Sequence, residues 1–346
     1  TYFPPEDMGD RPGFRRVCTA LSTAWADRRE EVLKNADELT NYLEKSLAPA
    51  LVAGEPSPKL FDQVLVQSRQ RFDKSHGGFG SPPNYAPKFP QSTELMVLMR
   101  HSESSAHAMA HKTLHAMRRG GMHDQLGGGF HRYSTDRKWL VPHFEKMLYD
   151  NALLVPCYLD GYRQTQDGRF AGVARTTLDY LLREMRAEAG GFWSSQDAQS
   201  EGVEGKFFVW ELAEVQQLLG PDAAMVAKVL GISRSGNWEH TNVLWLANEG
   251  AATAAFEGAR NTLFEAREER IKMATDDKVL ASWNGLTLTA LCDGYRALGD
   301  ERYLVAAKQC AAFMLDNLVT AGRVTRSFQG EQARHQGYLE EPGPAA

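Results

Sequence analysis

A run of glycines most constrains how this chain can fold. Residues 121–133 read GMHDQLGGGFHRY, with three consecutive glycines at positions 127–129. Glycine loses more backbone freedom on ordering than any other residue, so three in a row do not form the interior of a helix. They predict a loop that needs positive φ angles or close approach of another backbone segment. Ionisable and aromatic residues crowd the sequence around this loop, which is typical of a polar pocket rather than a core.

The same pattern, glycines followed by an aromatic residue, recurs along the chain. It appears at residues 77–80, 128–130 and 190–193, with a weaker copy at 236–238. Long segments with helical hydrophobic periodicity separate the copies. A unit of about 50 to 60 residues, made of two helices and one such loop, indicates a repeat architecture.

The hydrophobic periodicity predicts a mostly helical protein. A first helical segment runs from residue 14 to before Pro49, and the others are expected at 60–72, 93–117, 145–165, 168–188, 208–219, 222–230, 255–271, 281–298 and 301–319. Strand signals are few, at 132–140, 206–210 and 242–246. We expect an all-α fold, an (α/α)6 toroid with short strands on the loop side, whose loops converge on a central cleft. An α-solenoid is the alternative.

Composition narrows the class of protein. The 346 residues carry a net charge of −5 with no basic tract, which disfavours binding to nucleic acid or to an anionic membrane surface. No apolar run reaches the length of a transmembrane helix. Cys18, Cys157 and Cys292 lie in helical patterns with apolar neighbours and are expected to be buried free thiols, which suits a cytoplasmic location.

Five blocks of sequence resemble one known family. They are TYFPP with RPGF, GGFG with SPP and KFP, the block from GGMHDQLGGGFHRY to HFEKMLYDNA, GGFWSSQDA with SEGVEGKF, and DDKVLASWNG. In these blocks the chain is similar to the spermatogenesis-associated protein 20 / YyaL-type family. Membership implies an N-terminal thioredoxin-like domain joined to a six-hairpin α/α toroid, similar to the toroids of N-acylglucosamine 2-epimerase and the six-hairpin glycosidases.

The resemblance also implies how the chain is divided. Residues 1–56 correspond to the end of a thioredoxin-like domain and its linking helix, and residues 57–346 correspond to the toroid. The redox cysteines of such a domain lie upstream of this sequence. The Pro-rich residues 341–346 do not continue a helix, so we expect the last hairpins to be missing. The ring is then open, or is completed by a partner subunit in a homo-oligomer.

Two acidic segments could supply hydrolytic chemistry. Glu145 and Asp150 follow Pro142, and Asp197 and Glu201 lie in a second segment that extends to residue 204. Glycoside hydrolysis needs one protonated and one ionised carboxyl group. We expect Glu145 to pair with Asp197 or Glu201 as acid and base. A favourable interaction with the helix dipole is the alternative role for Glu145.

Histidines offer a competing chemistry. His131, His143 and His240 lie in segments expected on the loop side, and histidine titrates in the range needed to move a proton next to a sugar carbonyl. Arg132 or Lys88 could hold a carboxylate, a phosphate or the carbonyl oxygen of such a substrate. A sugar 2-epimerase or isomerase is therefore the second hypothesis. A non-catalytic sugar-binding or redox-partner module is the third.

Aromatic residues near the loops complete the expected site. Flat apolar rings stack on sugars, and neighbouring polar groups bond to sugar hydroxyls. The expected substrate-binding residues besides Lys88 and Arg132 are Tyr133, Asp150, Trp193, Asn237, Trp238, Trp283 and Asn284. The expected ligand is a small sugar or glycoside. No nucleotide or dinucleotide motif appears, and His107, His111 and His115 lack an acidic or cysteine partner, so we expect neither a cofactor nor a metal site.

Overall fold

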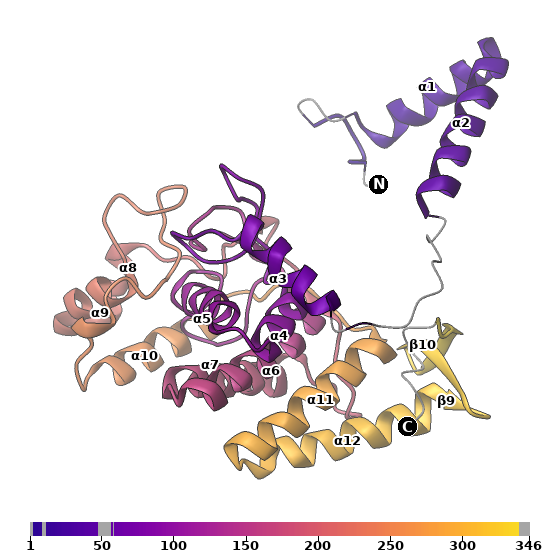
Figure 1. The fold of residues 1–346 in the computed structure, drawn as a ribbon. Coiled ribbons are helices and arrows are strands. Elements are labelled where there is room, and N and C mark those ends of the chain that lie inside the picture. Colours follow the sequence, from indigo (N-terminus) through magenta and orange to yellow (C-terminus); the bar gives the residue numbers. More distant parts are fainter. Residues whose placement is uncertain (1–2, 9–11, 48–56, 58, 339–346) are drawn as a thin grey trace. The chain divides into compact units, whose positions relative to one another are not determined.

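The computed structural model describes residues 3–8, 12–47, 57 and 59–338 (Figure 1). The chain divides into two compact units, residues 1–57 and 58–346. The Pro-rich residues 341–346, expected to end the helical pattern, lie outside the described residues.

The first unit contains two helices where the sequence predicted one. Helix α1 spans Phe14–Asp27 and helix α2 spans Arg29–Leu47. The helix breaks at Arg28, whose φ of −140° and ψ of 43° lie outside the helical region. The prediction that Cys18 is buried was wrong, because α1 contributes no residue to a core and the Cys18 thiol is exposed.

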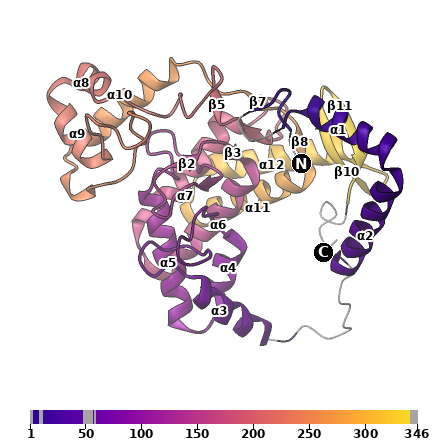
Figure 2. The same cartoon turned by 90° about the horizontal axis from the view of Figure 1, so that it is seen from above.

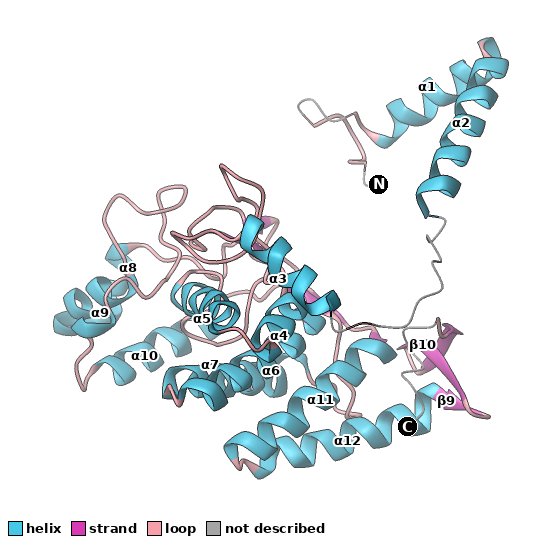
Figure 3. Ribbon diagram, in the orientation of Figure 1, coloured by secondary structure: helices cyan, strands magenta, loops and turns pink. Residues whose placement is uncertain are grey.

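The second unit is built from helices joined in pairs (Figures 1 and 3). Their bounds are α3 Lys59–Arg71, α4 Ser92–Arg100, α5 Ser104–Arg119, α6 Leu148–Thr165, α7 Gly168–Tyr180, α8 Leu212–Leu219, α9 Ala223–Leu230, α10 Phe256–Glu268, α11 Ala281–Leu298 and α12 Glu301–Leu318. A five-residue π-helical turn, Leu181–Met185, extends α7. Short connections join α4 to α5, α6 to α7 and α11 to α12.

These pairs pack against one another as helical hairpins. Helix α6 contacts α4, α7 and α11, and α11 in turn contacts α7 and α12, so α6 lies in the middle of the array (Figure 2). One hydrophobic core runs through all of these helices. The expected all-α fold, a toroid of helical hairpins with short strands on the loop side, is confirmed.

Three loops with the glycine–aromatic pattern are closed in the same way, although the third is one residue shorter. Each is closed by a bridge between the residue before the loop and the aromatic residue at its end: Phe72 with Phe79, His123 with Phe130, and Arg186 with Phe192. The first loop connects α3 to the segment that leads into α4, and the second connects α5 to the segment that leads into α6. The third follows the π-helical extension of α7 and precedes β4 and α8. The repeat expected from the sequence is therefore real in these three copies, whereas residues 236–238 lie between α9 and α10.

Glycine is required in the central loop for two reasons. Gly128 and Gly129 both have a φ of 75°, in the left-handed region. A Cβ atom on Gly129 would lie 2.5 Å from the Tyr180 ring, and one on Gly128 would lie 2.3 Å from the Thr176 carbonyl oxygen. The loop therefore presses its backbone directly against α7.

A buried lysine holds each of the first two loops. Lys88 Nζ donates to Asp73 Oδ2 at 2.9 Å and to the Gly77 carbonyl oxygen at 2.6 Å. Lys146 Nζ makes the equivalent bonds to Asp124 Oδ2 and to the carbonyl oxygen of residue 128, both at 2.9 Å. The third loop has an alanine, residue 187, at the position of the two aspartates. We call these two arrangements the aspartate–lysine clamps.

A buried asparagine holds the other side of the second and third loops. The side-chain amide of Asn151, in α6, accepts from the Phe130 N–H and donates to the Phe130 carbonyl oxygen. Asn284, in α11, makes the same two bonds with Phe192. The second loop is thus fixed to the first turn of α6, and the third to the first turn of α11.

The strands are short and lie mostly on the loop side. They are β1 Tyr133–Ser134, β2 Pro142–His143, β3 Lys146–Met147, β4 Ser195–Gln196, β5 Gln199–Ser200, β6 Val203–Glu204, β7 Thr275–Asp276, β8 Val279–Leu280, β9 Val319–Thr320, β10 Arg323–Gln329 and β11 Gln332–Gln336. Strand β4 pairs with β3 and β7, which brings segments far apart in sequence together beside α6 and α11. In the segments 206–210 and 242–246 the only pairing described is the bridge between Trp210 and Asn242.

We predict that Lys88→Met destabilises the protein by about 3 kcal/mol, because it leaves the buried Asp73 carboxylate without one of its two cationic partners. Burial alone would raise the pKa of Asp73, but Arg137 and Lys88 outweigh it and hold that pKa well below its ordinary value. Urea unfolding of the whole chain measures the change. Lys74→Met, at an exposed position in the same loop, is the control and should change the free energy of unfolding little. Equal effects of the two substitutions would contradict the clamp.

Candidate active site

A cluster of charged side chains lies at the start of α6, on the loop side. The Arg132 N–H donates to the Glu145 carbonyl oxygen at 2.8 Å, and Arg132 Nη1 donates to Glu145 Oε2, also at 2.8 Å. Tyr149 and Asp150 follow in the first turn of α6. We call Arg132, His143, Glu145, Tyr149 and Asp150 the α6 cluster.

Asp150 is the buried carboxyl group of this cluster. Only 8% of the residue is exposed, and its Oδ2 atom makes no hydrogen bond within the described part of the chain. Burial raises the pKa of Asp150 to about 7; Arg132 and the Tyr149 hydroxyl oppose this rise, and Glu145 adds to it. At neutral pH the carboxyl group is therefore partly protonated and can donate a proton.

Glu145 is held in the opposite state. His143 and Arg132 lower the pKa of Glu145 against the effect of its partial burial. The His143 Nε2 atom lies 3.6 Å from Glu145 Oε2. The cluster therefore combines an ionised carboxylate with a protonatable one. Pairs of carboxyl groups whose surroundings push their pKa values apart are typical of acid–base sites.

His143 links the cluster to the second acidic segment. Its Nδ1 atom lies 2.7 Å from Glu204 Oε1, in β6. Glu145 and Glu204 raise the pKa of His143, although its burial acts the other way. The imidazole also stacks on Tyr133, with ring centroids 5.1 Å apart. His143 can therefore hold or exchange a proton between two carboxylates.

Aromatic rings surround the α6 cluster. Tyr133 stacks on Phe89 at 4.8 Å as well as on His143. Tyr149 packs against Trp283, in the first turn of α11, at 4.8 Å. Trp193 is half-buried and packs against the apolar group around β8 and α12. The structure thus brings six of the predicted site residues to one region or its border: Arg132, Tyr133, His143, Glu145, Asp150 and Trp283.

The two acids predicted to pair with Glu145 lie in a different setting. Asp197 is exposed, and its Oδ1 atom accepts from the Gln199 N–H at 2.9 Å. Glu201 is exposed in the β5–β6 turn and pairs with Lys206 at 2.7 Å. No hydrogen bond or ion pair joins either acid to the α6 cluster in the described residues. Their pairing with Glu145 remains a prediction, whereas Asp150 is a carboxyl group of the cluster whose pKa Glu145 helps to raise.

His131 lies in the core. Its Nδ1 atom lies 2.9 Å from the Phe144 carbonyl oxygen, and its ring packs edge-on against Phe144 and Phe208. Burial and the nearby Lys146 lower the pKa of His131 to about 3. The imidazole is therefore neutral at physiological pH.

Lys88 and Asn284 make structural contacts. Lys88 is fully buried in the first aspartate–lysine clamp and also donates to the Arg137 carbonyl oxygen at 2.7 Å. Both polar atoms of the Asn284 amide are bonded to the backbone of Phe192. These side chains therefore have few free hydrogen-bonding groups with which to bind a ligand.

Asn237 and Trp238 lie in the segment between α9 and α10. The Asn237 amide bonds to the N–H and the carbonyl oxygen of Val243, each at 2.9 Å. Trp238 packs against Phe144, with ring centroids 5.2 Å apart. Asn237 therefore has a backbone-pairing role, while Trp238 stays partly exposed.

Sequence reasoning missed the buried charges behind the central loop. Asp124 accepts from Lys146 at 2.9 Å and from Arg267, in α10, at 2.8 Å. Burial lowers the pKa of Lys146 to about 8, with Asp124 acting to raise it. The sequence does contain a common pattern. Asp73 lies four residues before Gly77 and Asp124 four residues before Gly128, and Lys88 and Lys146 follow these loops further along the chain.

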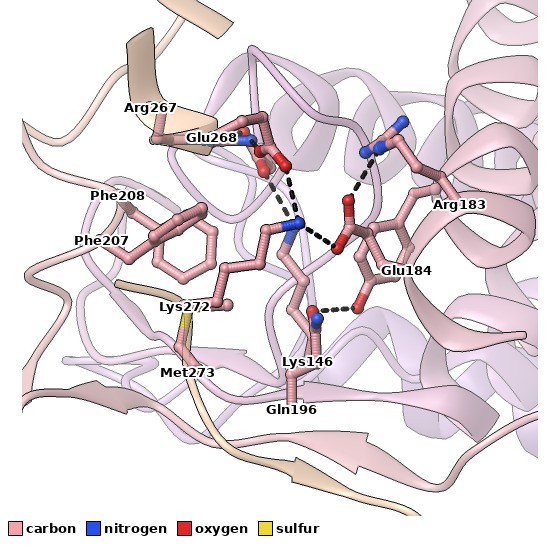
Figure 4. Close-up of a pocket in the computed structure, with 12 residues that line it drawn as sticks. Lys146, Arg183, Glu184, Gln196, Phe207, Phe208, Arg267, Glu268, Lys272 and Met273 are labelled. Atoms are coloured by element: carbon pink, nitrogen blue, oxygen red, sulfur yellow. Dashed lines mark hydrogen bonds and ion pairs between the residues drawn. The ribbon is translucent and has the colours of Figure 1, made fainter. Parts of the chain in front are cut away.

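These charges border a small pocket, shown in Figure 4. Lys272 lies between Glu184 and Glu268, at 3.0 and 2.7 Å, and Arg183 pairs with Glu184 at 2.8 Å. The charged groups in this pocket are paired with one another, although the buried Arg267 Nε atom has no hydrogen-bond partner within the described residues. We assign the pocket a structural role. The ion pairs of Lys272 connect α10 to the π-helical turn after α7.

The described residues contain no group of three or more His, Cys, Asp or Glu side chains placed to hold a metal ion. Within the same residues, no helix combines the length and the apolar character needed to cross a bilayer.

No protein-family model matches the chain. Spermatogenesis-associated protein 20 from Rattus norvegicus is 34% identical over 94% of the chain, and the Homo sapiens protein is 33% identical over 94%. The expected resemblance is confirmed. An uncharacterized Caenorhabditis elegans protein is 31% identical over 94% of the chain. The chain spans about half the length of these relatives, 47% to 50%.

Several solved structures are similar to the chain at low sequence identity. A family 76 glycoside hydrolase from a bovine Bacteroides thetaiotaomicron strain has a TM-score of 0.47 and 12% identity, over 76% of this chain and 43% of that one. Cellobiose 2-epimerase from Bacillus thermoamylovorans has a TM-score of 0.36 and 11% identity, over 80% and 93%.

We predict that Asp150→Asn stabilises the protein at high pH. The folded-state pKa of Asp150, about 7, lies above its ordinary value of 3.8, so the protonated carboxyl stabilises the fold and this contribution is lost as pH rises toward and through 7. An amide does not ionise, so the gain in unfolding free energy should be ~2 kcal/mol larger at pH 8 than at pH 5. Denaturant unfolding at both pH values measures it.

The control for this experiment is Asp197→Asn, which changes an exposed aspartate in the same unit. Its effect should be small and equal at the two pH values. A gain from Asp150→Asn that does not depend on pH would mean that Asp150 is ionised at both.

Proposed function

We propose that the α6 cluster binds a sugar and that Glu145 and Asp150 carry out glycoside hydrolysis as base and acid. The observation that carries the proposal is the buried Asp150 carboxyl group with its unbonded Oδ2 atom, beside an ionised Glu145 that Arg132 holds in place. Two carboxyl groups in opposite protonation states, flanking the glycosidic bond, are what its cleavage requires.

Each residue of the cluster has a distinct role in this proposal. Asp150 donates its proton to the leaving glycosidic oxygen, which avoids expulsion of an alkoxide. Glu145 supplies the negative charge that activates the attacking group and stabilises the developing positive charge on the sugar ring. Arg132 keeps Glu145 ionised and oriented. Trp283 offers a flat face on which the sugar can stack.

His143 supports the second candidate, a sugar 2-epimerase or isomerase. It is half-buried and contacts two carboxylates, Glu204 at 2.7 Å and Glu145 at 3.6 Å. A histidine in this position can remove and return a proton next to a sugar carbonyl, with the carboxylates stabilising its charged form. This chemistry would incorporate solvent deuterium at C2 of a reducing sugar, and hydrolysis would not.

We also propose that the protein is located in the cytoplasm. Cys157 and Cys310 are buried and not joined in a disulfide. Burial raises the pKa of both thiols, which makes them unreactive. Buried free thiols suit a reducing compartment.

We predict that Asp150→Asn lowers kcat/KM by about 10³-fold on alkyl glycosides and much less on dinitrophenyl glycosides. A good leaving group needs no proton, so only the poor leaving group depends on the acid. Glu145→Gln should lower the rate on both substrates by a similar factor. Initial rates over a panel of glycosides measure both variants.

Glu201→Gln is the matched control, because it removes an exposed carboxylate that makes no hydrogen bond or ion pair with the cluster among the described residues. Full activity of Glu145→Gln would remove that residue from the mechanism. Deuterium incorporation at C2 that depends on His143 would favour the epimerase. Binding of sugars without turnover by the wild-type chain would identify a binding module.

A further inference from the structure

A hollow with basic side chains lies along one side of α5. Its lining comes from α5, the first glycine loop, the segment between β1 and β2, and Trp245, and it shares no residue with the α6 cluster. The space inside the hollow, counted out to its open mouth, is about 950 Å³. The hollow can therefore hold a small molecule.

Three cationic side chains line this hollow. Helix α5 contributes Lys112 and Arg119, which lie on the same side of the helix and about 10 Å apart along its axis. Lys138 comes from the segment between β1 and β2, and all three residues are exposed. Among the described residues, no Asp or Glu lines the hollow. A chain with a net charge of −5 therefore has a local formal charge of +3 here.

None of these cations is paired with a carboxylate in the part of the chain that the structure describes. The ammonium group of Lys138 has no hydrogen-bond or ion-pair partner there. Lys112 Nζ donates to the Lys74 carbonyl oxygen, which leaves two of its three N–H groups free. Arg119 donates from Nε and Nη2 to a single carbonyl oxygen, that of Leu246. Most of the donors are therefore available to a ligand.

The acidic residues around the hollow are bonded to other groups. Asp73 belongs to the first aspartate–lysine clamp and also pairs with Arg137. Asp136 accepts from three backbone N–H groups. Both carboxylate oxygens of Glu249 accept from Arg118. None of these carboxylates bonds to a cation of the lining, so the positive charge of the hollow favours an anion.

Two histidines of the lining add no charge at physiological pH. Burial lowers the pKa of His76 and of His115. Lys138 lowers the pKa of His76 further, so its ammonium group lies near that ring. A neutral imidazole can still donate one hydrogen bond to an anion.

Trp245 gives the hollow a flat apolar wall. Its pyrrole edge rests on Gly231, the C-cap of α9, where a Cβ atom would lie 2.1 Å from Trp245 Nε1. Gly231 has a φ of 66°, in the left-handed region, so glycine is favoured there for its backbone as well. The indole is half-buried and lines the hollow. A flat indole surface favours a ligand that carries a ring.

We propose that this hollow binds a phosphate monoester that carries a flat ring. Its phosphate oxygens accept from Lys112, Arg119 and Lys138, and its ring packs against Trp245. A phosphate monoester has a charge of about −2 at neutral pH, so it matches a lining with three cations better than a single carboxylate does. The site is independent of the sugar chemistry proposed for the α6 cluster.

Two exposed lysines allow a matched test. Lys138 lines the hollow, whereas Lys308, in α12, does not. Lys138→Glu and Lys308→Glu change the net charge of the protein equally, and both should leave the fold intact because they alter exposed positions. Only Lys138→Glu places a carboxylate in the hollow.

Calorimetric titration of the full chain with phenyl phosphate tests the proposal. We expect one molar equivalent to bind the wild type and Lys308→Glu, and to bind Lys138→Glu about tenfold more weakly. Inorganic phosphate, which lacks the ring, and benzoate, which carries one charge, should each bind the wild type more weakly than phenyl phosphate. Trp245→Leu should remove the preference for phenyl phosphate over inorganic phosphate.

Four results would overturn the proposal. One is no binding of phenyl phosphate to the wild type. Another is equal affinity of Lys138→Glu and Lys308→Glu, which would place binding elsewhere or make it a response to net charge. The third is benzoate binding as tightly as phenyl phosphate. The fourth is a preference for phenyl phosphate over inorganic phosphate that Trp245→Leu leaves unchanged.

Discussion

The buried pairing of an aspartate with a lysine at each of the first two glycine loops is the interaction on which the second unit depends. Lys88 with Asp73 and Lys146 with Asp124 have almost no exposed surface, and each lysine also binds a glycine carbonyl oxygen of its loop. Removing one partner from such a pair leaves an uncompensated buried charge, which costs far more than the loss of a surface ion pair. The two clamps therefore fix loops that would otherwise be the most flexible parts of a helical array.

The position of the candidate site follows from this constraint. The second clamp ends at Lys146, and Asn151 ties the same loop to the first turn of α6. Glu145, Tyr149 and Asp150 lie between or next to these fixed points, so their placement is set by groups that take no part in the proposed chemistry. Asp150 is buried without a bond to one of its oxygens, which lowers stability at neutral pH. Strain of this kind is frequent at functional sites, where the surrounding structure compensates for it.

The sequence allowed the helical hairpins and the repeated loops to be predicted, because helical periodicity and runs of glycine are local signals. It also indicated the region of the α6 cluster, since Arg132, His143 and Glu145 are close in the chain. The break at Arg28 was missed because neither glycine nor proline marks it. The roles of Lys88 and Asn284 were missed because their partners, 15 and 92 residues away, are brought to them only by packing. For the same reason the burial of Asp150, which decides its protonation, could not be read from its neighbours in the chain.

The account depends most on the protonation state of Asp150. The direct measurement is a pH titration of its side-chain carboxyl carbon by ¹³C NMR, with the signal assigned by its absence in Asp150→Asn. The account predicts a midpoint near pH 7, well above that of Glu145 in the same spectra. A midpoint near pH 4 for Asp150 would show that both carboxyl groups are ionised at neutral pH, and the proposed acid would be absent.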